Sequence, residues 1–120
     1  MRKLLPLLIA VASIASCGGG NDDNSQLPAT SVSMYKILGS TQCYGGGTTV
    51  VALAQQLFSV GVAVLSSICG NDGLEHPTVC GANDGAIGIF EFAVAQQQAA
   101  SNLGFSLLSS LPSAIAGTCQ

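Results

Sequence analysis

Two stretches of this chain repeat one another. Residues 61–68 read Gly-Val-Ala-Val-Leu-Ser-Ser-Ile and residues 104–111 read Gly-Phe-Ser-Leu-Leu-Ser-Ser-Leu, so every position is identical or similar in kind. Each glycine follows a helix-like segment, at the position after a helix end where a positive φ is common. The repeat predicts two equivalent units, in which strands at 62–68 and 105–110 each follow a helix.

The two preceding segments have helical character. In the first, Thr48 is a candidate N-cap, and apolar residues recur at helical spacing up to Gly61. The second is predicted from about Ala93 to Leu103, because alanines and the glutamines at 96–98 favour a helix with a shallow apolar face. Its terminal glycine is Gly104.

A strand candidate precedes each helix. The first covers 32–38 and the second covers 86–92, where Ile87 and Ile89 face one way and Phe90 and Phe92 the other. The resulting β-α-β-β-α-β order predicts an α+β domain over 32–120 with a ferredoxin-like antiparallel sheet and two helices on one face. The alternative is a less regular α+β domain with an extra strand at 78–81.

The N-terminus has the layout of a secretory signal peptide. Arg2 and Lys3 precede an apolar stretch from Leu4 to Ala15, which small residues close. That stretch is well below the ~20 residues that a membrane-spanning helix needs. We therefore expect 1–16 to be removed on export.

The end of the signal resembles a bacterial lipobox: Ile14, Ala15 and Ser16 precede Cys17. The resemblance implies a diacylglyceryl group on the Cys17 thiol, cleavage before Cys17 and acylation of the new amine. Two or three acyl chains anchor a protein stably. Residues 17–31, glycine-rich at first and then polar, are expected to form a flexible tether. Gly18 after the cysteine favours the outer membrane, facing the periplasm.

Charge limits the partners of the exported part. After Cys17, Lys36 is the single basic residue against six acidic ones, a balance of −5. Such a chain cannot neutralise a row of phosphates, which excludes nucleic acid, and it is not attracted to anionic lipid head groups. Membrane attachment must then come from the lipid on Cys17.

Four cysteines remain in the exported domain, namely Cys43, Cys69, Cys80 and Cys119. An even number in an oxidising compartment predicts two disulfides. Spacing favours Cys69–Cys80 across a short loop and Cys43–Cys119 around most of the domain, although three connectivities exist. The absence of a Cys-x-x-Cys pair argues against a metal site or a redox motif in these cysteines.

The run from Cys69 to Cys80 resembles a Kazal-type protease-inhibitor segment, since Cys-Gly-Asn-Asp-Gly opens a stretch that ends in a second cysteine. It lacks the flanking cysteines of that family and has His76 where an aromatic residue is usual. The resemblance covers about a tenth of the chain. It implies, as an alternative function, a periplasmic inhibitor that acts through this loop.

Two Asn-Asp-Gly sequences, at 71–73 and 83–85, predict tight turns with a positive φ at glycine. If the turns fold together, the acids Asp72, Glu75 and Asp84 gather at one edge, where their oxygens suit Ca²⁺. The EF-hand spacing is absent and turn chemistry alone explains these residues, so no metal site is assigned.

The sequence contains little that indicates catalysis or cofactor binding. His76, the single histidine, lies in a loop, and Glu91 is the one acid inside a predicted strand. The glycines at 45–47 enter a helix without the lysine of a phosphate loop. We therefore expect no enzyme and no cofactor. The sequence favours an envelope lipoprotein that binds a protein or a wall component.

Overall fold

The computed structural model describes residues 30–119, so Cys17, the signal and most of the predicted tether lie outside the described residues. The first strand begins at Ser31, one residue earlier than the predicted domain boundary. The elements in chain order are β1 (Ser31–Ile37), α1 (Val50–Ser59), β2 (Val64–Asn71), β3 (Ala86–Ala93), the 3-10 turn η2 (Val94–Gln96), α2 (Gln97–Asn102), β4 (Ser106–Leu107), the 3-10 turn η3 (Leu108–Ser110) and β5 (Ile115–Gly117).

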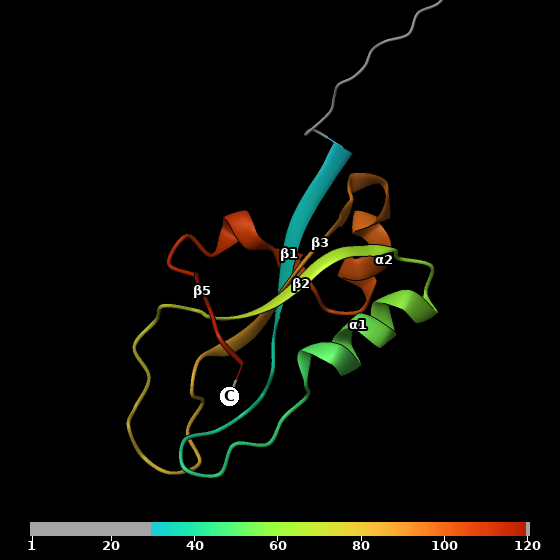
Figure 1. Cartoon of the computed structure of the whole chain (residues 1–120). Coiled ribbons are helices and arrows are strands. Elements are labelled where there is room, and N and C mark those ends of the chain that lie inside the picture. The colour runs from blue at the N-terminus through green and yellow to red at the C-terminus, as the bar shows by residue number, and fades with distance from the viewer. Residues whose placement is uncertain (1–29, 120) are drawn as a thin grey trace, which may run out of the picture.

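These strands form one antiparallel sheet of five strands in the order β4-β1-β3-β2-β5 (Figure 1). The α+β class, the antiparallel sheet, the two helices and the two disulfides are confirmed. The structure does not support a ferredoxin-like sheet of four strands. β4 has only two residues, and a fifth strand, β5, extends the sheet beyond β2. Residues 78–81 form no strand either.

Helix α1 begins one residue later than predicted. Thr49, not Thr48, is the N-cap, and its side-chain oxygen accepts a hydrogen bond from the backbone N–H of Ala52 at 3.0 Å. This cap satisfies one of the first amides of the helix, which have no intrahelical partner. Leu53 and Leu57 then project from one face into the core.

Helix α2 is shorter than the predicted span of 93–103. Strand β3 extends to Ala93, and η2 follows before α2 covers only Gln97–Asn102. Gln96 explains part of this difference, because its side chain is bonded to the α1–β2 turn: it accepts from the Ala63 amide and donates to the Gly61 carbonyl. Within residues 30–119, no helix has the length and apolar character of a membrane span.

Both helices end in the same hydrogen-bonded motif. After α1, the backbone amides of Gly61 and Val62 donate to the carbonyls of Phe58 and Leu57, respectively. After α2, the amides of Gly104 and Phe105 donate in the same way to the carbonyls of Ser101 and Ala100. This is the Schellman pattern, which needs a left-handed residue at the glycine. Gly61 has φ 87° and Gly104 has φ 95°. The predicted equivalence of the two glycines is confirmed.

The equivalence fails one step later. β2 continues for eight residues, with a bulge between Val64 and Ser66, whereas β4 ends at Leu107 and the chain turns into η3. The prediction of a second strand over 105–110 was therefore wrong. Only Met34 and Tyr35 of β1 pair with β4, and the chain then leaves the plane of the sheet.

The two faces of β3 are covered differently. Phe90 and Phe92 pack with residues of both helices and with Met34 in the main core, so α1 and α2 lie on the same face. Phe105 meets Phe90 edge-on, with ring centroids 5.5 Å apart. Ile87 and Ile89 are also buried but stand outside that core cluster, on the opposite face, as the alternation predicted.

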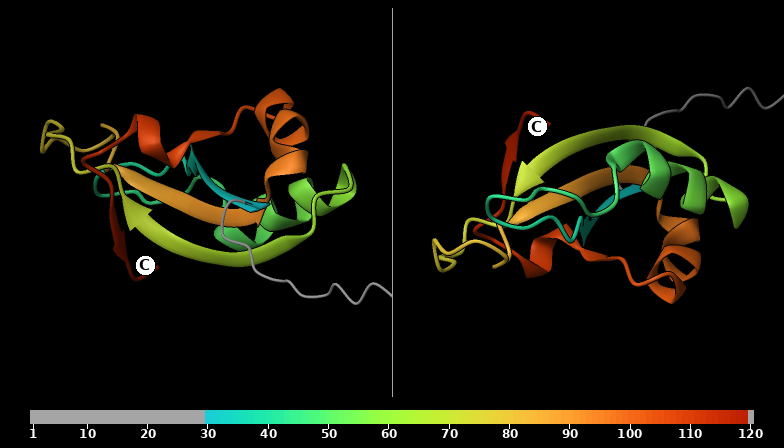
Figure 2. Two further views of the ribbon diagram at one scale, coloured as in Figure 1. Left: turned by 90° about the horizontal axis from the view of Figure 1, so that it is seen from above. Right: turned by 90° about the horizontal axis from the view of Figure 1, so that it is seen from below.

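The C-terminal segment crosses this second face. It runs from η3 beside β1 to β5 beside β2, as both views of Figure 2 show. A Cβ on Gly70 would lie 2.7 Å from the Ile115 carbonyl oxygen and 2.8 Å from Cδ1 of Ile89. The backbone of this segment therefore packs closely against the face that carries Ile87 and Ile89.

Candidate functional site

The end of the sheet opposite the start of β1 is built from two copies of one turn. In each Asn-Asp-Gly sequence the asparagine oxygen accepts from the glycine amide, Gly73 or Gly85. In each, the aspartate oxygen accepts from the residue after that glycine, Leu74 or Ala86. Gly73 has φ 72° and Gly85 has φ 84°, which confirms the predicted turn conformations. Short side chains replace backbone partners here, as expected for Asx turns.

The two turns are fastened to each other. The Asp72 amide donates to the Gly85 carbonyl at 2.8 Å, and the Asn71 side chain donates to the Asp84 carbonyl at 3.3 Å. A Cβ on Gly85 would lie 2.9 Å from the Asn71 side chain and 3.0 Å from that of Asp72. The condition of the calcium hypothesis, that the turns fold together, is thus met.

The carboxylates nevertheless do not converge on a cation position. Asp72 is buried and accepts from His76 Nε2, at 2.8 and 3.0 Å to its two oxygens. Asp84 accepts from Ser40 Oγ at 2.8 Å and from the Ala86 amide. In residues 30–119 no group of three or more His, Cys, Asp or Glu side chains is arranged to hold a metal ion.

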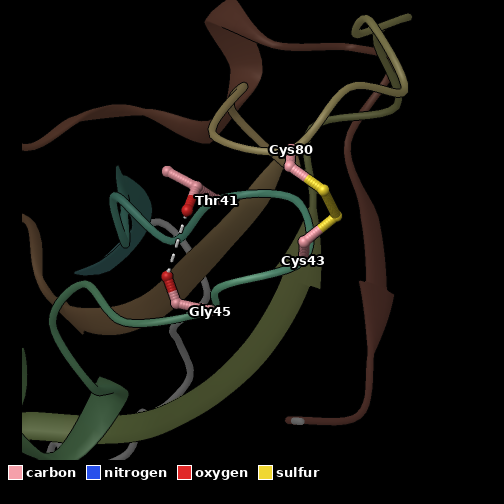
Figure 3. The surroundings of a disulfide bond; sticks show 4 residues. All are labelled: Thr41, Cys43, Gly45 and Cys80. Carbon is pink, nitrogen blue, oxygen red and sulfur yellow. Dashed lines mark hydrogen bonds between the residues drawn. A yellow bond between two sulfur atoms is a disulfide. The ribbon is translucent and has the colours of Figure 1, made fainter.

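A glycine-rich turn packs against these Asx turns. Thr41 and Gly45 exchange backbone hydrogen bonds of 2.9 Å, and the Thr41 hydroxyl also reaches the Gly45 carbonyl at 3.5 Å (Figure 3). At the tip, Cys43 has φ 71°, a conformation that costs a residue with a Cβ of order 1 kcal/mol. The Gln42 amide donates to Ala82 and the Gly81 amide donates to Gln42, which ties the turn to the 72–85 loop.

The disulfides join different partners from those predicted. Cys43 is bonded to Cys80, with a Cα–Cα distance of 5.0 Å (Figure 3). Cys69 is bonded to Cys119, with a Cα–Cα distance of 5.1 Å. The predicted Cys69–Cys80 and Cys43–Cys119 pairs were wrong. Cys69 lies inside β2 opposite Gly117 of β5, which brings Cys119 to it, whereas Cys80 lies in the loop that packs on the Cys43 turn.

This pairing also bears on the inhibitor alternative. Cys69 and Cys80, which bound the segment that resembles a Kazal-type inhibitor, are each bonded to a cysteine outside that segment. The loop between them is still exposed at Leu74 and Val79. The inhibitor alternative therefore stays a prediction.

A groove lies between the glycine-rich turn, the start of α1 and the ends of β2 and β5, with a cavity volume of about 970 Å³. Sequence reasoning missed it, because its walls come from segments far apart in the chain. The predicted residues Cys43, Cys69 and Cys119 form part of its wall, whereas His76 does not line it. Its polar lining consists of hydroxyl and amide side chains and one carboxylate: Ser40, Thr41, Gln42, Thr48, Thr49, Asn71, Asp84 and Thr118.

Some of these polar groups are already used and some are not. Ser40 bonds Asp84, Thr49 caps α1 and Asn71 holds its Asx turn. The hydroxyls of Thr48 and Thr118 make no hydrogen bond to another residue in the described range. The groove thus offers unpaired hydroxyls on a frame that disulfides and Asx turns hold in place.

Among residues 30–119, Asp84 is the only ionisable side chain that lines the groove. The hydrogen bond from the Ala86 amide, and to a smaller extent the one from Ser40, lowers its pKa below the ordinary value, although desolvation opposes the shift. A carboxylate that is held ionised in this way is a weak proton acceptor.

The remaining candidates lie elsewhere. Glu91 is half-buried on β3, the central strand of the sheet, and accepts from the Ser31 hydroxyl at 2.9 Å. Gly45 and Gly46 line the groove, while Gly47 packs against the backbone of residues 38–40.

Comparisons with protein-family models, curated proteins and solved structures find no match to this chain.

Proposed function

We propose that this protein is a bacterial envelope lipoprotein, anchored through lipid on Cys17, whose domain acts by binding and not by catalysis. The lipobox-like sequence from Ile14 to Cys17 supports the anchor. The groove supports binding: among the described residues that line it, Thr48 and Thr118 offer free hydroxyls, and the single carboxylate, Asp84, is already hydrogen-bonded. Its volume lies in the range of ligand pockets, which are commonly 300–1,000 Å³.

The chemistry of the lining suggests the class of ligand. Hydroxyl and amide groups without a cation suit an uncharged, hydroxyl- or amide-rich molecule, because an anionic ligand would lose its hydration without gaining a cationic partner, and the Asp84 carboxylate already accepts hydrogen bonds from Ser40 and Ala86. Tyr44, between the groove residues Cys43 and Gly45, adds an exposed aromatic surface beside the opening. A glycan of the cell wall has this character, and an envelope anchor would hold the groove near it.

The test is co-sedimentation of the mature protein with purified cell-wall sacculi. Thr48→Val and Thr118→Val each remove one free hydroxyl at nearly constant volume and should weaken binding roughly 2- to 12-fold, the equivalent of one net hydrogen bond. Thr78→Val is the matched control, because Thr78 is an exposed threonine of the 72–85 loop outside the groove.

Two results would contradict the proposal. The first is an equal loss of binding in the Thr78→Val control, which would place the contact outside the groove. The second is a wild-type protein that does not sediment with sacculi while a cross-linked envelope protein is found on the groove residues; the partner is then a protein. The lipid anchor is tested separately, by the mass of the N-terminal peptide.

A further inference from the structure

One end of the domain exposes four large apolar side chains. Phe58 is 79% exposed and Leu65 is 66% exposed, and Val60 and Val94 are exposed as well. We refer to these four residues as the apolar pole. Phe58 lies in the last turn of α1, Val60 is the C-cap residue after it, Leu65 is the second residue of β2 and Val94 is the first residue of η2.

Hydrogen bonds and register place these segments together. The Gln96 side chain bridges from η2 to Gly61 and Ala63, at 2.7 and 3.1 Å. At the same end of the sheet, Val64 pairs with Phe92. These segments are therefore neighbours in the fold, and the end of α1 and the start of β2 lie on the right of Figure 1.

The chain enters the domain at this same end. Ser31, the first residue of β1, pairs with Ala93, the residue before Val94. Residues 18–30 separate Ser31 from Cys17, and a chain of that length spans at most roughly 45 Å when fully extended. A lipid on Cys17 thus keeps the start of β1, at the same end of the sheet as the apolar pole, within that distance of the bilayer surface.

The acidic side chains of residues 30–119 are concentrated at the other end. Asp72, Glu75 and Asp84 belong to the 72–85 loop and its base, at the lower left of Figure 1. Of the acids in residues 30–119, Glu91 alone lies nearer the apolar pole, where it is half-buried and bonded to Ser31. An anionic bilayer surface repels the acidic end and leaves the apolar pole free to approach.

We propose that the apolar pole rests on the bilayer surface, so that the domain is held with its groove and disulfide end directed away from the membrane. This inference rests on the lipid anchor of the proposed function and adds an orientation to it. Exposed phenylalanine, leucine and valine side chains insert at the boundary between head groups and acyl chains. The anchor makes the contact intramolecular, so a weak apolar contact suffices.

The absence of tryptophan in the chain provides the probe. Phe58→Trp places a single indole at the apolar pole, and Tyr44→Trp places one at the opposite end; the two native rings are 79% and 74% exposed. Each lipidated mature protein is reconstituted in vesicles of phosphatidylethanolamine and phosphatidylglycerol, with and without brominated acyl chains. A second set carries a hexahistidine tag before Gly18 on vesicles with a nickel-chelating lipid, which anchors the domain without native lipidation.

The expected result is several-fold stronger quenching by brominated lipid, and a blue-shifted emission, for Phe58→Trp than for Tyr44→Trp in both sets. Leu65→Ser in the Phe58→Trp protein should lower that quenching. Equal, aqueous emission from both indoles on anchored protein would overturn the inference, as would stronger quenching at position 44. A blue shift at position 58 without lipid quenching would also overturn it, because another protein surface then covers the pole. If only the lipidated set fails to associate with vesicles, the anchor on Cys17 fails and the orientation stands.

Discussion

The two helix–strand units of this domain end their helices in the same way and then diverge. Val62 and Phe105 occupy equivalent positions, each buried directly after a left-handed glycine. From there β2 continues to Asn71, whereas β4 ends at Leu107. The same eight-residue pattern thus produces a long strand in one unit and a two-residue strand followed by a 3-10 turn in the other.

The difference shows that the helix ends are determined by local sequence, whereas the lengths of the strands that follow are determined by tertiary contacts. A Schellman motif closes over six residues, so the sequence of those residues determines it. A strand needs a partner along its length, and β2 has β3 on one side and β5 on part of the other. β4 pairs only with β1, and the segment that follows β4 crosses the second face of the sheet, which carries Ile87 and Ile89.

The largest expected effect tests the bond that joins the first unit to the tail of the second. Replacing Cys69 and Cys119 with alanine should lower the free energy of unfolding by about 4 kcal/mol, since the bond closes a separation of 50 residues. The matched Cys43→Ala, Cys80→Ala protein should lose a similar amount, because its separation is 37 residues. Urea denaturation gives both values.

Hydrogen exchange then distinguishes the two variants. Loss of Cys69–Cys119 should raise exchange at the amides of β5, because this bond ties residues 115–117 to β2. Loss of Cys43–Cys80 should leave β5 protected. Equal protection of β5 in both variants would contradict the role given to the C-terminal segment.

The buried residues after the two glycines should contribute different amounts to the free energy of unfolding. Phe105→Ala should cost about 3–5 kcal/mol, because it removes the ring that packs edge-on against Phe90. Val62→Ala removes a smaller side chain from the same core and should cost about 1–2 kcal/mol. Both values come from denaturant midpoints, and the comparison fails if Val62→Ala is the more destabilising change.

The two glycines themselves should be equivalent. Gly61→Val and Gly104→Val should each destabilise by about 1–2 kcal/mol, because a β-branched residue is strained at positive φ. A Cβ at Gly61 meets nothing within 4 Å, and one at Gly104 meets only the end of the Lys36 side chain at 3.5 Å, so strain dominates in both. A cost at one position and none at the other would mean that the two helix ends are not equivalent.

The smallest effect concerns Asp84, at the junction between the two units. Its pKa is lowered in the folded state, so it contributes stability above the unfolded value of about 3.9, and that contribution is lost as the pH falls towards the folded value. Asp84→Asn should therefore make stability less dependent on pH between about 5 and 3. Glu75→Gln, at an exposed acid of the same loop, is the control and should leave the dependence closer to that of the wild type.

What the sequence predicted correctly is largely local. The positive φ of Gly61 and Gly104, the two Asn-Asp-Gly turns and the opposite faces of Phe90 and Ile89 follow from short patterns. The disulfide partners were not predictable in this way. Cys69–Cys119 depends on a three-residue strand, Ile115–Gly117, which carries no signal of its own, and Cys43–Cys80 depends on the packing of two loops far apart in the chain. The groove was missed for the same reason, since the strand pairs and disulfides that assemble its walls are long-range.

The proposed function and the orientation at the membrane both rest on the lipid on Cys17, so the mass of the mature N-terminal peptide is the most direct test. The account predicts a peptide that begins at Cys17 and carries a diacylglyceryl group and an acylated amine, and it predicts that Cys17→Ser protein remains unlabelled by fatty acid and uncleaved. A wild-type peptide with an unmodified Cys17, or a Cys17→Ser protein that is processed normally, would contradict it.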